Sequence, residues 1–262
     1  MTKADSFVLA DVLLPSRFLL GSAGYPSPQV LRDAISASHA AVVTVGLKRQ
    51  LAAASTDNGF IEIIRASGVR LLPNTAGCRS AREAIALAHM ARELLGTHWV
   101  KLEVVGDEHT LQPDPFELLE ATRQLVKDGF EVFPYCTDDL VTGQRLADAG
   151  CRILMPWAAP IGSGQGLINP SALRTLRARL PQLTLIVDAG IGRPSHAAQV
   201  MELGYDAVLL NSAVANATDP VGMADAFRLG IEAGRRAFLS GWIAPQDMAV
   251  ASTPVSGRPF EI

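Results

Sequence analysis

Residues 98–106, with the sequence HWVKLEVVG, place two charged side chains inside an otherwise apolar segment. The β-branched and apolar residues predict a buried strand, which Gly106 closes. Side chains alternate along a strand, so Lys101 and Glu103 share one face and their apolar neighbours share the other. A lysine buried in a strand is costly unless it is paired or used in chemistry. The pair is therefore either a structural ion pair or an imine-forming amine beside a proton-transferring carboxylate.

The composition predicts a chain that folds into a compact enzyme-sized domain. Of its 262 residues, 48% are hydrophobic and 19% are charged, which is enough to bury a large core. The net charge of −3 and the lack of a basic run argue against a nucleic-acid binder. The apolar start at residues 1–20 is broken by Asp5, Asp11, Pro15 and Arg17, so it predicts neither a signal peptide nor a membrane span. We therefore expect a cytoplasmic protein.

The cysteines and histidines predict no metal site. Cys78, Cys136 and Cys151 are odd in number and far apart, which is typical of a reducing compartment without a disulfide framework. They form no metal-type pair, and the histidines show no ligand spacing. We expect no protein-held metal and no cofactor.

Short apolar runs alternate with longer amphipathic segments throughout the chain. Strands are predicted at 18–23, 41–47, 69–75, 98–106, 131–137, 152–159, 184–191 and 207–214. A helix is predicted after each strand, at 28–38, from 60, and at 80–95, 114–128, 138–149, 169–180, 195–203 and from 219. The helix from Ser80 carries a capping box with Glu83, and a loop is predicted at 57–59.

Eight alternating strand-helix units predict a parallel sheet. A chain of this length with eight such units is typical of a closed (β/α)8 TIM barrel, an α/β fold. We expect residues 1–262 to form a single barrel domain, with 241–262 as a C-terminal tail. A doubly wound open sheet is the structural alternative, but no GxGxxG motif opens the first helix.

In a parallel barrel, functional groups gather at the carboxyl ends of the strands. Residues 162–166 (GSGQG) follow the sixth strand and allow a backbone to approach an anion closely. Residues 188–192 (DAGIG) end the seventh strand and lead to a helix start near Ser195, and Asn211 and Ser212 end the eighth. Each glycine alone only indicates a loop, but together the three clusters predict a phosphate pocket.

Asp188 is a carboxylate in an otherwise apolar strand, so it either caps an amide or faces the barrel mouth. In the second case Lys101, Glu103 and Asp188 converge beside the phosphate pocket. This set suits a phosphorylated ketose, whose carbonyl the amine attacks while the carboxylates move protons. The amine must be neutral to attack, which desolvation favours and a neighbouring carboxylate opposes.

Five motifs resemble the thiazole synthase family of thiamine biosynthesis. They are LPNTAGC at 72–78, VKLEV at 100–104, PYCTDD at 134–139, APIGSG at 159–164 and VDAGIG at 187–192. The resemblance implies a (β/α)8 barrel that forms thiazole phosphate from 1-deoxy-D-xylulose 5-phosphate, dehydroglycine and a thiocarboxylated, ThiS-like sulfur-carrier protein. It also implies a homotetramer without bound metal. A separate enzyme of the ThiH or ThiO type would supply the dehydroglycine.

The same resemblance implies a role for individual residues. Lys101 would form the Schiff base with the sugar ketone, and Glu103 and Asp188 would be the acid/base pair. The substrate, chiefly its phosphate, would be held by Gly162, Ala189, Gly190, Asn211 and Ser212.

Two positions depart from the family pattern. The family reads Gly-Thr-Gly-Lys-Tyr after the first strand, where this chain has GSAGY at 21–25 and no lysine. Trp157 stands where the family has leucine, either as packing or as a narrowing of the mouth. Two other functions stay open: another Schiff-base barrel, such as a class I aldolase or the ring-building subunit of pyridoxal phosphate synthase, and a non-catalytic docking protein for the carrier.

The helical pattern ends at Gly241, after which proline, serine and glycine accumulate. The tail is therefore disordered or folded over one barrel end. An aromatic-bearing extension would expose apolar surface, so we hypothesise that residues 242–260 close over the mouth or contact the carrier.

Overall fold

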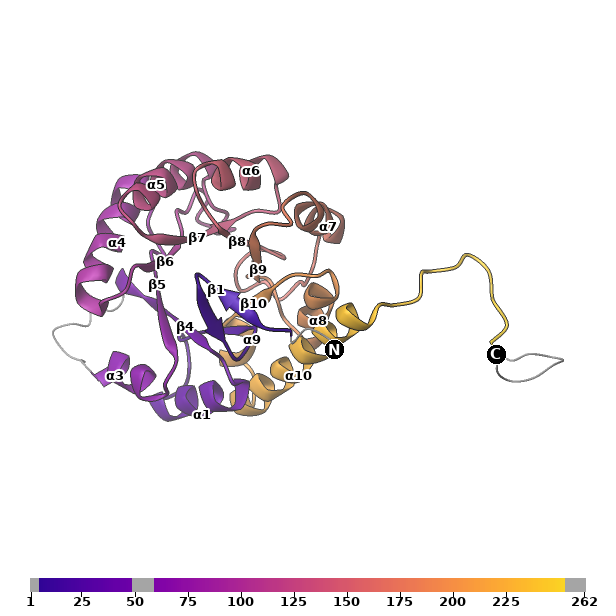
Figure 1. Ribbon diagram of the computed structural model, residues 1–262. Helices are drawn as coiled ribbons and strands as arrows, with labels where there is room; N and C mark the ends of the chain where they lie inside the picture. Colours follow the sequence, from indigo (N-terminus) through magenta and orange to yellow (C-terminus); the bar gives the residue numbers. More distant parts are fainter. Residues whose placement is uncertain (1–4, 49–58, 253–262) are drawn as a thin grey trace.

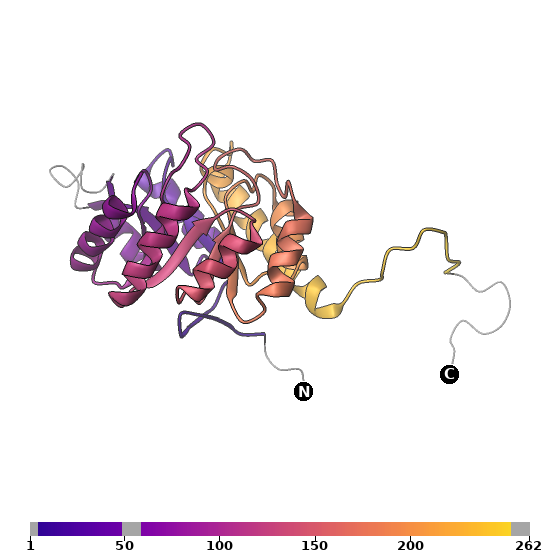
Figure 2. The same ribbon diagram turned by 90° about the horizontal axis from the view of Figure 1, so that it is seen from above.

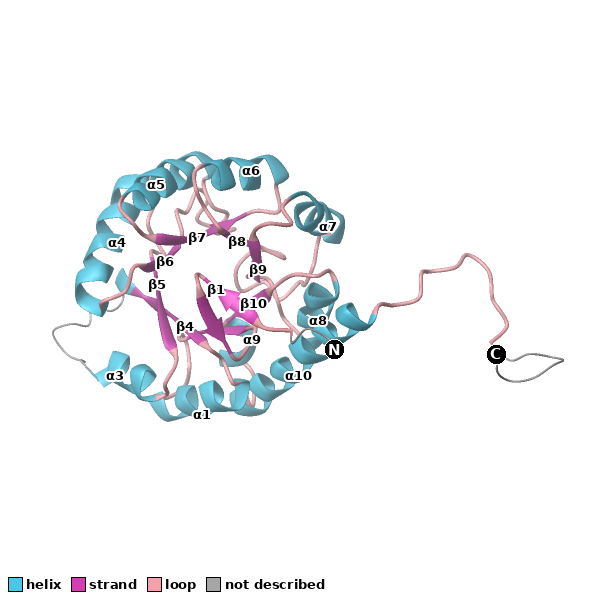
Figure 3. Cartoon of the chain, viewed as in Figure 1, coloured by secondary structure: helices cyan, strands magenta, loops and turns pink. Residues whose placement is uncertain are grey.

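Eight parallel strands close into a barrel in the computed structural model, which describes residues 5–48 and 59–252 (Figures 1 and 3). Neighbouring strands follow chain order, and the last strand pairs with the first in parallel register. The barrel strands are β3 (Phe18–Gly21), β4 (Val42–Gly46), β5 (Arg70–Asn74), β6 (Trp99–Leu102), β7 (Glu131–Cys136), β8 (Ile153–Pro156), β9 (Thr184–Asp188) and β10 (Ala207–Leu210). The predicted (β/α)8 fold is confirmed, and the open-sheet alternative is wrong.

Helices surround the barrel as an outer ring (Figure 3). They are α1 (Pro28–Ser38), α3 (Gly59–Ala66), α4 (Ala81–Leu95), α5 (Pro115–Lys127), α6 (Leu140–Asp148), α7 (Pro170–Arg179), α8 (Pro194–Glu202), α9 (Ser212–Ala215) and α10 (Pro220–Ser240). The strand predicted at 207–214 ends at Leu210, and the short α9 that follows β10 was not predicted. Asp57 and Asn58 of the predicted loop lie outside the described residues. None of the described helices has both the length and the hydropathy needed to cross a membrane.

The predicted capping box of α4 is only half formed. Ser80 Oγ accepts a hydrogen bond from the backbone N–H of Glu83, as expected. The Glu83 carboxylate, however, accepts from the backbone N–H of Arg79 and pairs with Lys48. The acidic side chain is drawn toward the lysine, so the reciprocal bond to Ser80 is not made.

The strand alternation sorts side chains into two layers. Val100, Leu102 and Val104 pack in the outer core between strands and helices. Lys101 and Glu103 therefore face the barrel interior, as predicted. The lower interior is apolar and includes Trp99 and Phe133, so the charges lie above a closed hydrophobic floor.

An antiparallel hairpin of β1 (Phe7–Leu9) and β2 (Val12–Leu14) plugs the amino-terminal end of the barrel (Figure 2). Phe7, Leu9 and Leu14 are buried in the same interior core as Trp99. The two turn residues, Ala10 and Asp11, have positive φ angles of 47° and 65°. A turn of this kind usually contains glycine or asparagine. The turn at Ala10 and Asp11 contains neither residue, so the hairpin was not predicted.

The helical pattern stops where predicted, because α10 ends at Ser240. Barrel helices run opposite to the strands, so the tail begins at the end of the barrel that carries the hairpin (Figure 2). Its described part, residues 241–252, is exposed and extends away from the barrel. This part does not cover the mouth of its own barrel, so the hypothesis that the tail closes over the mouth is wrong for these residues. Residues 253–260 lie outside the described residues.

Candidate active site

Three charged side chains meet in the upper interior of the barrel. Lys101 Nζ lies 2.9 Å from Glu103 Oε1 and 2.5 Å from Asp188 Oδ2. Their exposed fractions are only 5%, 6% and 3% for Lys101, Glu103 and Asp188. Asp188 comes from β9, which is not a neighbour of β6, so its contact with Lys101 crosses the interior. The structure thus brings together the three residues predicted to converge.

Glu103 is held in place through its backbone. The Thr75 hydroxyl, fully buried at the end of β5, donates to the carbonyl of Glu103 and accepts from its N–H, both at 2.8 Å. Two hydrogen bonds to one buried hydroxyl fix the chain just past β6, where the regular strand has ended. Sequence reasoning did not single out Thr75 as a support for this carboxylate.

The charges of the site are strongly coupled. Burial alone would lower the pKa of Lys101, but the charges of Asp188 and Glu103 outweigh it and raise that pKa. Burial also raises the pKa of Asp188; Lys101 opposes this rise, and Glu103 adds to it. One ammonium with two carboxylates would leave a buried net negative charge, which favours a further proton on Asp188. The site can therefore both hold and pass on a proton.

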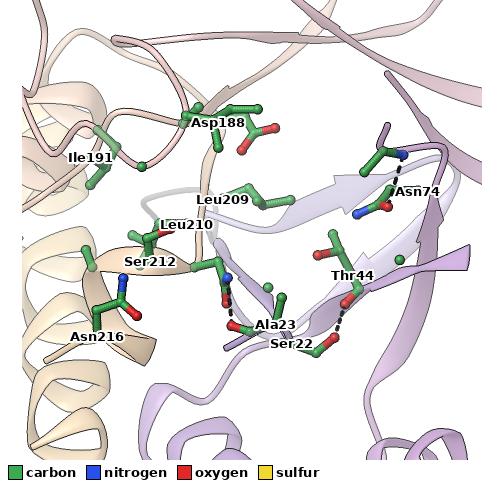
Figure 4. Close-up of a pocket in the computed structure, with 18 of the residues that line it drawn as sticks. Ser22, Ala23, Thr44, Asn74, Asp188, Ile191, Leu209, Leu210, Ser212 and Asn216 are labelled. Atoms are coloured by element: carbon green, nitrogen blue, oxygen red, sulfur yellow. Dashed lines mark hydrogen bonds between the residues drawn. The ribbon is translucent and has the colours of Figure 1, made fainter. Parts of the chain in front are cut away.

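A cavity of about 650 Å³ lies at the carboxyl ends of the strands, above these charges. Figure 4 shows side chains from β4, β5, β9 and β10 converging on it, among them Thr44, Asn74 and Asp188. All residues predicted for catalysis or substrate binding line it: Lys101, Glu103, Gly162, Asp188, Ala189, Gly190, Asn211 and Ser212. The volume suits a small metabolite.

The loop after β9 adopts a backbone that few side chains tolerate. Ala189 and Gly190 have φ angles of 70° and 73°. A Cβ on Gly190 would lie 2.4 Å from both the backbone N and the Cβ of Ala159. Gly190 O accepts from the N–H of Gly166 at 2.8 Å, which ties this loop to the glycine-rich loop after β8. The glycines thus allow two loops to pack closely at one wall of the cavity.

The wall at the end of β10 is built around Asn211. Its Nδ2 donates to the carbonyl of Ala23 at 2.9 Å, while its buried Oδ1 has no partner among the described residues. A Cβ on Gly21 would lie 2.4 Å from Asn211 Cβ, so this asparagine requires a glycine on β3. Ser212 opens α9 and lines the cavity, whereas Ser195 does not. The helix bordering the predicted phosphate pocket is therefore α9 rather than α8 alone.

Lys48 is a second lysine of the cavity lining that sequence reasoning missed. It follows β4 and donates to the carbonyl of Gly77 at 2.6 Å. The available signal was its position directly after the apolar run 41–47. Lys48 lies at the mouth of the barrel in a chain that lacks the family's lysine after the first strand. Its side chain is half exposed, whereas that of Lys101 is buried.

Trp157 is buried and does not line the cavity. Its Nε1 donates to Asp138 Oδ1 at 2.9 Å. Of the two interpretations, the geometry supports packing and does not support a narrowed mouth.

Comparison with known proteins identifies the family. A family model described as thiazole biosynthesis protein ThiG matches residues 8–254. A thiazole synthase of Bradyrhizobium sp. (strain ORS 278) is 60% identical over 250 residues, covering 95% of this chain and 96% of that protein. The chain belongs to the thiazole synthase family. A thiazole synthase of Coxiella burnetii (strain RSA 331 / Henzerling II) is 58% identical over 256 residues, covering 98% of both chains.

Structural comparison agrees with this family membership. A crystal structure of the BexX/CysO complex from Amycolatopsis orientalis matches with a TM-score of 0.79 and 31% identity, covering 93% of this chain and 98% of that chain. The resemblance predicted from the five motifs is confirmed. As a member of the family, the chain is an enzyme of thiazole formation in thiamine biosynthesis.

Proposed function

We propose that this enzyme forms thiazole phosphate through a Schiff base on Lys101. The substrates would be 1-deoxy-D-xylulose 5-phosphate, dehydroglycine and the thiocarboxylated C-terminus of a sulfur-carrier protein. The observation that carries the proposal is the buried Lys101 amine, held between Glu103 and Asp188 beneath the cavity. A structural ion pair needs one carboxylate, whereas this amine contacts two.

The first step would be proton transfer from the Lys101 ammonium to Asp188. The 2.5 Å separation permits it, and burial raises the pKa of the receiving carboxyl, which acts against the raised pKa of the Lys101 ammonium. The neutral amine adds to the ketone, and the carbonyl oxygen leaves as water with the proton held by Asp188. This leaves the protonated imine and restores the Asp188 carboxylate. Glu103 and Asp188 then remove the proton from the adjacent hydroxyl-bearing carbon, which gives the enamine. They return a proton to the nitrogen-bearing carbon and accept the hydroxyl proton, which moves the carbonyl along the chain. Protons are conserved within the three residues and the substrate.

The substrate phosphate would lie against the loops after β8, β9 and β10. Gly162, Ala189 and Gly190 line the cavity on these loops, and Asn211 and Ser212 line it at the end of β10. Positive φ angles at 162, 189 and 190 support a closely approaching anion, because such turns direct N–H groups toward one point.

The proposal includes protein partners. The structural relative is a complex of BexX with a second protein, CysO, which supports a protein partner for this chain as well. We expect that partner to be a ThiS-like sulfur carrier, and dehydroglycine to come from a separate ThiH- or ThiO-type enzyme. We also expect a cytoplasmic homotetramer. Exposed apolar side chains on helices, such as Met90 at 45% and Leu94 at 59%, support self-association, which light scattering after size-exclusion chromatography would test.

Borohydride trapping tests the Schiff base directly. The protein is incubated with 1-deoxy-D-xylulose 5-phosphate and borohydride, and its intact mass is measured. We expect one sugar adduct on the native chain and none on Lys101→Ala. Lys48→Ala is the matched control, because it removes another lysine of the same cavity and should keep the adduct.

Three results would contradict the proposal. An adduct retained by Lys101→Ala but lost from Lys48→Ala would show that Lys48, and not Lys101, forms the imine. No adduct on a native chain that demonstrably binds the sugar would make Lys101 a structural cation. Carbon–carbon cleavage without any carrier would instead indicate an aldolase.

A further inference from the structure

Tyr135 lies against the Lys101 amine but is not explained by the proposed chemistry. Its ring centroid is 5.7 Å from Lys101 Nζ. It shares the inward face of β7 with Phe133, and only 1% of its surface is exposed. Glu103, Asp188 and the Tyr135 ring thus surround the same ammonium. The aromatic face is a favourable neighbour for a cation.

The Tyr135 hydroxyl is buried and has no hydrogen-bond partner among the described residues. Another buried tyrosine, Tyr205, donates its hydroxyl to the carbonyl of Leu173 at 2.9 Å. Leaving a buried donor unpaired is costly, so the Tyr135 hydroxyl calls for an explanation. Burial, followed by the charges of Asp188 and Glu103, raises the pKa of Tyr135. The phenol therefore keeps its proton and stays a donor.

Asp188 has a buried oxygen that lacks a hydrogen-bond donor. Apart from the ion pair with Lys101, its buried Oδ2 makes no hydrogen bond within the described chain. When the Lys101 ammonium, with three N–H donors, becomes a protonated imine with one, Asp188 and Glu103 compete for that single donor. A buried carboxylate left without a partner is strongly destabilised. Of the two carboxylates, only Asp188 has a buried oxygen without a hydrogen-bond partner among the described residues, which makes it the acceptor that the Tyr135 hydroxyl can satisfy.

We propose that Tyr135 is a positioning residue whose ring holds Lys101 against the carboxylates and whose hydroxyl donates to Asp188 once the imine has formed. This inference rests on the proposed function. The phenol proton is shared in the hydrogen bond and is not transferred, while the substrate C–H proton goes to the carboxylate pair. Tyr135 would therefore act after the amine has reacted, on the step that forms the enamine.

The test separates the two steps with the sugar substrate alone. Imine formation is measured by borohydride-trapped adduct, and enamine formation by deuterium exchange in D2O at the carbon next to the ketone. Tyr135→Phe keeps the ring and should leave the adduct within about twofold, but slow the exchange at least about tenfold, as expected for losing a hydrogen bond to a charged group. Tyr135→Leu also removes the ring and should reduce both. Tyr205→Phe is the matched control, and should leave both within about twofold per folded molecule.

Three outcomes would overturn the inference. Native-like exchange in Tyr135→Phe would leave the hydroxyl without a role. A parallel loss of adduct and exchange in Tyr135→Phe, matching Tyr135→Leu, would reduce the residue to packing. If the native chain forms no adduct, the proposed function fails first and this inference falls with it, a result distinguishable from a defect confined to the Tyr135 variants.

Discussion

The two ends of the barrel are built on opposite principles. At the mouth, Lys101 and two carboxylates are buried, and polar atoms of Tyr135 and Asn211 lack partners among the described residues. At the amino-terminal end, apolar hairpin side chains fill the interior and a cluster of three charged side chains is paired: Asp5 accepts from Arg17 at 2.8 Å and from Arg235 at 2.7 and 3.0 Å. The mouth keeps polar groups without hydrogen-bond partners, which a substrate can provide, whereas the other end contributes stability.

The largest expected effect is at the mouth and on chemistry alone. Lys101→Ala should lower turnover at least about a thousandfold, because the imine-forming amine is gone. Steady-state thiazole formation measures this, with Lys127→Ala as a control that removes an exposed lysine at the end of α5. Turnover within tenfold of the native chain would contradict the division between the two ends.

The next effect belongs to the closed end and to stability. Leu9 is fully buried, so Leu9→Ala should lower the free energy of unfolding by about 3 kcal/mol through the cavity it leaves. Turnover per folded molecule should stay native. Denaturant unfolding measures the change, and Val8→Ala, on the 50% exposed face of the same hairpin, should cost less than about 1 kcal/mol. Equal effects of the two variants would show that the hairpin is not a plug.

Gly190→Ala should affect both properties at the mouth. The positive φ and the collision with Ala159 should cost about 2 kcal/mol of stability and raise the KM for the sugar phosphate. Gly68→Ala is the matched control: its φ of 71° is similar, but nothing lies within 4 Å of the added Cβ. It should cost about 1 kcal/mol and leave KM unchanged. If both variants behave alike, close loop packing does not shape the substrate site.

The smallest effect tests the charge pairing of the closed end. The hydrogen bond from Arg235 lowers the pKa of Asp5 from 3.8, burial opposes it, and the charge of Arg17 lowers it further. Because the folded pKa is depressed, the stabilisation is present above pH 3.8 and is lost as the pH falls through the folded value. Asp5→Ala should therefore cost about 1 kcal/mol at pH 7.

The same variant should cost progressively less below pH 3.8, as measured by urea unfolding across pH. Asp247→Ala, which removes an exposed carboxylate after α10, should cost nothing at either pH. A cost of Asp5→Ala that does not change with pH would show that the pairing is not electrostatic.

Much of the fold was predictable because its signals are local. Alternation of apolar residues placed Lys101 and Glu103 on one face, and the cap residue Ser80 marked the start of α4. The hairpin was missed because Ala10 and Asp11 adopt positive φ without glycine, held by the core beneath them. The four-residue α9 was missed because so short a helix has no periodicity to detect.

The sequence by itself determined the barrel, the family and the residue types of the site, since periodicity, glycine positions and motifs are properties of the chain. Only the tertiary structure decided which groups touch. Three features depend on strands that are distant along the chain. They are the 2.5 Å contact of Lys101 with Asp188, the unpartnered hydroxyl of Tyr135 and the position of Lys48 in the cavity lining. Such contacts follow from closing the barrel, because closure sets distances across the interior that no local pattern encodes.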